Sequence, residues 1–217
     1  MRISPTHKFI FIAIEKTGTN SIRHCLNNFA DTKPGDGINP HWPACKVRAH
    51  YFETPQSNFE DYFSFAFVRN PWARLVSWFE YFNREVNKHE SGAPSEGGIP
   101  TGPARHPAYA QWKTYSMMDF ATWLRREHAQ NSHRLSYQRY YEDENGKPLL
   151  NFIGKTENLQ EDFNIVCDKI GIPRQKLPHK NKTKHKHYST YYDDDTRELV
   201  AEKYAKDIER FGYSFGD

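Results

Sequence analysis

Two short segments of this sequence combine residue types that bind anions, and each begins where an apolar run gives way to a turn. In the first segment, Lys16 is followed by Thr17-Gly18-Thr19-Asn20-Ser21. In the second, Arg69 precedes Asn70-Pro71, and Ser77 follows two helical turns later. A cation, small hydroxyl residues and the N–H groups of a helix start together hold phosphate-like groups. Two such segments predict a ligand with two separate anionic groups.

The two segments suit different anions. Gly18 lets the backbone approach a bulky anion, and Lys16 supplies a mobile point charge. Because Lys16 precedes Gly18, the Walker A pattern G-x-x-x-x-G-K-[ST] of P-loop kinases is absent. Arg69 with Ser77 suits a phosphate monoester, since a guanidinium fork binds two phosphate oxygens at once.

The elements that must position these residues are those of a layered α/β fold. Residues 8–14 and 62–68 are apolar runs typical of buried parallel strands. Helix signals predict helices over 21–29, 119–128, 161–170 and 194–210, and a further helix that begins at Asn70-Pro71. We also expect a short strand over 46–49 and a hairpin turn at Asn145-Gly146. Strands that alternate with helices predict a mainly parallel central sheet flanked by helices.

Length and composition predict a single domain over residues 1–217. Within it, residues 87–107 form a Gly/Pro/Ser-rich loop or lid, and residues 179–187 form a basic loop. The 30 Lys and Arg against 27 Asp and Glu leave a net charge of +3, which disfavours nucleic acid as a partner. The three cysteines lack metal-ligand spacing, so we expect no metal site. Without a signal peptide or an apolar run that could span a bilayer, we expect a cytoplasmic protein.

Three segments resemble sulfotransferases that use 3′-phosphoadenosine 5′-phosphosulfate (PAPS). Residues 15–21 resemble the 5′-phosphosulfate loop P-K-[ST]-G-[ST], with Glu15 in place of the proline. Residues 69–77 resemble the 3′-phosphate motif R-[ND]-P-x-x-R-x-x-S of the carbohydrate branch, which includes the heparan and chondroitin sulfotransferases. Residues 151–163 resemble a segment with [YF]-E-[DN]-L that passes near the adenine. The resemblance implies a P-loop-like sulfotransferase fold over about residues 8–215.

The resemblance also implies how PAPS is bound. Lys16 would stabilise the leaving phosphate oxygen, Arg69 and Ser77 would bind the 3′-phosphate, and Glu157 would hold a turn through backbone N–H groups. Arg74 would brace its helix or contact substrate. The residues expected to bind the nucleotide are Lys16, Thr17, Gly18, Thr19, Asn20, Ser21, Arg69, Ser77, Thr156 and, in the basic loop, Lys180, Asn181 and Lys182.

Sulfuryl transfer to a hydroxyl also needs a base for the acceptor proton. His50 is the first candidate, because it follows the predicted strand at 46–49 and related carbohydrate sulfotransferases place a catalytic histidine between the two phosphate motifs. His133 is the second, since residues 131–134 resemble a segment of the chondroitin-type enzymes, and His41 is the third. With eleven histidines in the chain, a histidine with no catalytic role is the alternative in each case.

These interpretations predict an enzyme that moves the sulfuryl group of PAPS to a hydroxyl of a carbohydrate acceptor by in-line displacement. Two alternatives stay open. One is a P-loop-type small-molecule kinase, which predicts a Mg²⁺ site. The other is a non-enzymatic polyanion-binding domain that uses the basic loop.

Overall fold

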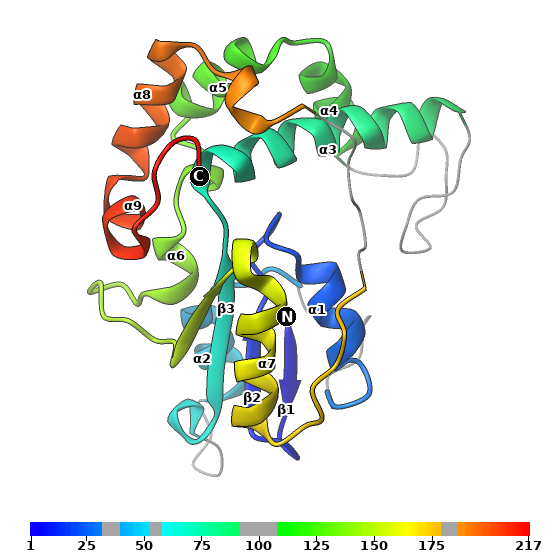
Figure 1. Ribbon diagram of the computed structural model, residues 1–217, viewed down its shortest axis with the longest axis vertical. Helices are drawn as coiled ribbons and strands as arrows, with labels where there is room; N and C mark the ends of the chain where they lie inside the picture. The colour runs from blue at the N-terminus through cyan, green and yellow to red at the C-terminus, as the bar shows by residue number, and fades with distance from the viewer. Residues whose placement is uncertain (32–39, 53–57, 92–107, 179–185) are drawn as a thin grey trace. The chain divides into compact units, whose positions relative to one another are not determined.

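The computed structural model describes residues 1–31, 40–52, 58–91, 108–178 and 186–217 (Figure 1). The chain divides into two compact units. The first consists of residues 1–70 and 136–182, and the second of residues 71–135 and 183–217. The single sulfotransferase domain expected over 1–217 stays a prediction.

A four-stranded sheet forms the centre of the first unit, with strand order β1-β2-β3-β4 (Figure 1). The strands are β1 (Arg2–Ser4), β2 (Phe9–Ile12), β3 (Phe63–Val68) and β4 (Phe152–Lys155). β2, β3 and β4 are parallel to one another, and β1 is antiparallel to β2. The mainly parallel sheet is therefore confirmed, whereas the sequence did not indicate β1, because three residues are too few to show alternation.

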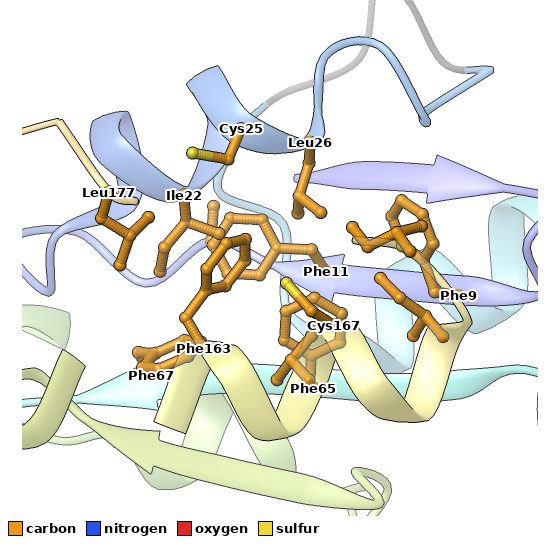
Figure 2. Close-up of a cluster of buried hydrophobic side chains, with 14 residues drawn as sticks. Phe9, Phe11, Ile22, Cys25, Leu26, Phe65, Phe67, Phe163, Cys167 and Leu177 are labelled. Atoms are coloured by element: carbon orange, nitrogen blue, oxygen red, sulfur yellow. The ribbon is translucent and has the colours of Figure 1, made fainter. Parts of the chain in front are cut away.

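Helices α1 (Thr19–Leu26) and α7 (Leu159–Ile170) cover one face of this sheet. Figure 2 shows the side chains that they bury together with alternate residues of β2 and β3. Aromatic rings supply much of this core, as Phe11 stacks on Phe65 with ring centroids 5.2 Å apart. The core therefore holds the starts of both helices close to the ends of the strands.

Helix α2 (Ala44–Tyr51) occupies the segment for which the sequence predicted a strand over 46–49, so that prediction is wrong. Ala, Lys and Arg favour helix, and Ala44 and Val47 are both buried at a spacing of three residues. A second short helix, α6 (Gln138–Tyr141), precedes the turn at Gly146, which has φ 77° as expected of Asn-Gly. The predicted hairpin is reduced to a single bridge between Glu142 and Pro148.

The second unit is helical. Its helices are α3 (Pro71–Ser91), α4 (Tyr109–Ser116), α5 (Phe120–Ala129), α8 (Asp194–Lys203) and α9 (Ala205–Phe211). α3 begins at Pro71 as predicted, and the apolar residues at helical spacing along it are all buried: Trp72, Leu75, Val76, Phe79, Phe82 and Val86. Asp119 caps α5 as predicted by accepting the Thr122 N–H at 2.8 Å.

Other predictions for this unit need correction or lie outside the described residues. The helix predicted over 194–210 is two helices that meet at Tyr204. α3 continues through residues 87–91 of the predicted loop, and residues 92–107 lie outside the described part of the chain, as do residues 179–185 of the basic loop. Within the described ranges, no helix has the length and apolar character needed to cross a bilayer.

Candidate functional site

The loop between β2 and α1 turns through two residues in left-handed backbone conformation. Lys16 has φ 67° and Gly18 has φ 76°. Glycine adopts this region freely, whereas for lysine it costs roughly 1–2 kcal/mol, a strain that persists only where the surrounding structure enforces it. The Gly18 carbonyl accepts the N–H groups of Ser21 and Ile22 at 3.1 and 3.3 Å, so α1 starts directly from the loop. The tight turn brings Lys16 beside a helix N-terminus.

The first N–H groups of α1 are the feature of this loop that could bind an anion. Those of Thr19 and Asn20 have no acceptor among the residues that the structure describes. Free N–H groups at a helix start carry a partial positive charge. Asn20 is exposed, so the helix start can be reached by a ligand.

Two hydroxyl groups of the loop hold the structure together. The fully buried Thr17 donates through Oγ1 to the Ile14 carbonyl at 2.9 Å. Ser21 donates through Oγ to the Pro178 carbonyl at 2.6 Å. Thr17 and Ser21 were expected to contact the nucleotide, but both hydroxyls are engaged within the fold, and the Ser21 N–H already donates to the Gly18 carbonyl. The bond from Ser21 also brings the residue before the basic loop against α1, whereas Lys180, Asn181 and Lys182 lie outside the described residues.

The end of β3 lies beside the turn that leads into α7. Arg69 is partly buried. The Thr156 hydroxyl donates to the Val68 carbonyl at 2.8 Å, and a Glu157 carboxylate oxygen accepts the Asn70 N–H at 2.7 Å. The carboxylate thus binds a backbone N–H, as the resemblance implied. Arg69 and Thr156 are brought together at this edge of the sheet.

Two other residues of the 3′-phosphate motif belong to the second unit. Ser77 lies on α3 and is partly buried. Arg74 is fully buried, and its Nη1 donates to the Arg134 carbonyl at 3.0 Å and to the Tyr204 hydroxyl at 2.9 Å. Of the two roles left open for Arg74, the structure shows the brace.

The candidate bases lie in different settings. His41 Nδ1 is 2.8 Å from the carbonyl of Ala13, the residue directly after β2. A carbonyl only accepts, so Nδ1 carries the hydrogen and Nε2 is left with its lone pair. Burial lowers the pKa of His41 to about 4, against a partly opposing effect of the Glu15 carboxylate. The imidazole is therefore neutral at neutral pH.

His50 is exposed in the last turn of α2 rather than after a strand. Its ring contacts those of Trp42 and Tyr51, with centroids 5.0 and 4.8 Å away. His133 is the first residue of a 3-10 turn (His133–Leu135) in the second unit. The structure thus ties His41 to the β2–α1 loop by a direct hydrogen bond. In the described part of the chain, no group of three or more His, Cys, Asp or Glu side chains could hold a metal ion.

Comparison with known proteins agrees with these motifs. A family profile described as "Sulfotransferase family" matches residues 1–214. The chain belongs to the sulfotransferase family. This sulfotransferase is also 28% identical to an uncharacterized protein of Archaeoglobus fulgidus over an alignment of 120 residues. The alignment covers 54% of the present chain and 74% of that relative. No solved structure matches the present chain significantly.

Two residues of the candidate site in this sulfotransferase have partners that the sequence did not indicate. Glu15, which replaces the usual proline of the 5′-phosphosulfate loop, accepts a hydrogen bond from the Tyr140 hydroxyl. Tyr137 contacts the backbone of Arg69. Both tyrosines are distant in sequence from their partners and are among thirteen in the chain, so no sequence signal distinguishes them.

Proposed function

We propose that this sulfotransferase moves the sulfuryl group of PAPS to a hydroxyl of a carbohydrate acceptor. The β2–α1 loop carries the proposal, because Lys16 stands beside a helix start whose first N–H groups are open to an anion. The R-[ND]-P-x-x-R-x-x-S resemblance at residues 69–77 supports the carbohydrate branch. When bound, PAPS supplies an activated sulfuryl group whose leaving group is a phosphate.

The residues of the first unit divide the binding of such a donor between two places. At the β2–α1 loop, the N–H groups of Thr19 and Asn20 hold the 5′ end, and Lys16 balances the charge that grows on the leaving oxygen. At the end of β3, Arg69 takes the 3′-phosphate and Thr156 lies near the adenine. Ser77 on α3 and residues 180–182 of the basic loop are the remaining proposed contacts.

For the base, the structure supports His41 better than His50. Ala13 lies three residues before Lys16, and its carbonyl fixes the tautomer of His41 in which Nε2 is the proton acceptor. Negative charge of a bound donor would raise the pKa of His41 from about 4 toward neutrality, where a general base is most effective. We therefore propose that His41 takes the acceptor proton, with His50 and His133 as the alternatives.

The competing functions predict different ligands. A P-loop-type kinase needs Mg²⁺ with a nucleoside di- or triphosphate, and a polyanion-binding domain needs no nucleotide at all. Membership of the sulfotransferase family favours sulfuryl transfer over both.

Calorimetric titration separates these readings. The proposal predicts tight, metal-independent binding of 3′-phosphoadenosine 5′-phosphate (PAP) and much weaker binding of ADP. Stronger binding of ADP with Mg²⁺ would refute it. Transfer of labelled sulfate across a panel of glycans and small alcohols then identifies the acceptor, and a preference for small alcohols would refute the carbohydrate assignment.

A further inference from the structure

The peptide group that precedes Arg69 is held at both ends by side chains. The Val68 carbonyl accepts the Thr156 hydroxyl at 2.8 Å. On the other side of the same peptide, the Arg69 N–H donates to the Tyr137 hydroxyl oxygen at 3.2 Å. These side chains come from segments that lie 68 and 88 residues away along the chain.

The peptide group that follows Arg69 is held in the same way. The Tyr137 hydroxyl donates to the Arg69 carbonyl at 2.6 Å. The Asn70 N–H donates to the Glu157 carboxylate at 2.7 Å. All polar groups of the two peptides that flank Arg69 are therefore paired with side chains.

This arrangement continues the pairing of β3 beyond the end of the strand. β3 ends at Val68, which pairs with Lys155 of β4. One residue further on, the Tyr137 hydroxyl both accepts and donates, as the backbone of an adjacent strand would. Tyr137 has no exposed surface, so water does not compete for these bonds. With both peptide planes held, φ and ψ of Arg69 are fixed, and with them the direction of its Cα–Cβ bond.

We propose that Tyr137 is a positioning residue for Arg69, which it holds in the backbone conformation that directs the guanidinium to the 3′-phosphate. This inference rests on the proposed function, in which Arg69 binds that group. Bidentate binding of phosphate depends on orientation as well as charge, so a guanidinium held in place loses less freedom on binding.

Substitution of Tyr137→Phe removes the hydroxyl and keeps the ring. Calorimetry measures the affinities of the variant for PAP and for adenosine 5′-phosphate (AMP), and the ratio of the two reports the 3′-phosphate contact alone. We expect this ratio to fall about tenfold, as for a charged contact weakened by about 1.4 kcal/mol, with AMP affinity unchanged. Ser64→Ala is the matched control, because it removes a buried hydroxyl from the opposite end of β3. It should keep the wild-type ratio.

Two further measurements test the same proposal. In an Arg69→Ala background, Tyr137→Phe should cause no additional loss, since the group that it positions is gone. If Tyr137→Phe does not fold, Glu157→Ala should lower the ratio, and Glu157→Gln, which retains an acceptor oxygen, should restore it. An unchanged ratio, or an equal loss for both nucleotides, overturns the role of Tyr137. A wild-type protein that binds PAP and AMP equally overturns the proposed 3′-phosphate site itself, and the role of Tyr137 with it.

Discussion

Replacement of Gly18 by alanine should both destabilise the fold and weaken nucleotide binding. Gly18 has φ 76°, a conformation that costs an L-residue roughly 1–2 kcal/mol. An added Cβ would lie 2.8 Å from Cδ2 of Leu159, whereas carbon atoms normally meet at about 3.5–4.0 Å. The leucine or the loop must therefore shift. The two effects together lower the free energy of unfolding by about 2–3 kcal/mol.

Gly171 provides a matched control for this substitution. It has φ 69° at the end of α7, and an added Cβ would meet nothing within 4 Å. Gly171→Ala therefore carries the backbone cost alone, roughly 1–2 kcal/mol. Urea unfolding of the two variants in parallel isolates the contact with Leu159 as the difference between them. In calorimetric titration, Gly18→Ala should bind PAP about tenfold more weakly, and Gly171→Ala should bind it as the wild type does.

Two outcomes would refute this reasoning. Equal losses of stability in the two variants would show that the contact with Leu159 costs nothing. Wild-type affinity for PAP in a destabilised Gly18→Ala variant would show that the 5′ end of the nucleotide binds elsewhere than at the start of α1.

Two further predictions concern His41. The His41→Asn variant keeps a donor for the Ala13 carbonyl but has no base. It should therefore retain PAP binding and lose most turnover in a labelled-sulfate assay. Full activity of His41→Asn together with loss of activity in His50→Asn would make His50 the base. Because the folded-state pKa of about 4 lies below the ordinary imidazole value, the unfolded chain binds this proton first as the pH falls. As the pH falls from about 6.5 to 4, the free energy of unfolding should therefore decrease by about 2–3 kcal/mol. The same decrease in the His41→Asn variant would show that His41 is not the group responsible.

Features encoded by neighbouring residues could be predicted from the sequence. The apolar runs at 8–14 and 62–68 are the buried strands β2 and β3, and Asn70-Pro71 does open α3. The helix predicted over 161–170 is part of α7, which ends at Gly171 with positive φ. In each case the local sequence and the packing of the fold favour the same conformation, which is why short-range signals succeed.

Predictions failed where a short segment suits more than one conformation. Residues 46–49 form part of helix α2, whereas their sequence predicts a strand that leads to His50. The residues that precede the predicted hairpin turn form the short helix α6, and the predicted C-terminal helix breaks at Tyr204. Packing decides whether such a segment is helix or strand, because a run of four residues does not distinguish the 3.6-residue period of a helix from the two-residue period of a strand.

The sequence by itself indicated a sulfotransferase, since the residues of each predicted anion-binding segment are contiguous and a turn places them at a helix start. Only the tertiary structure decided how those residues are held. It engaged the hydroxyls of Thr17 and Ser21 within the fold, brought His41 to the Ala13 carbonyl, and placed Tyr137 against the backbone of Arg69. These contacts join residues that are far apart in the chain or hidden from solvent. They depend on the complete fold, and no local pattern records them.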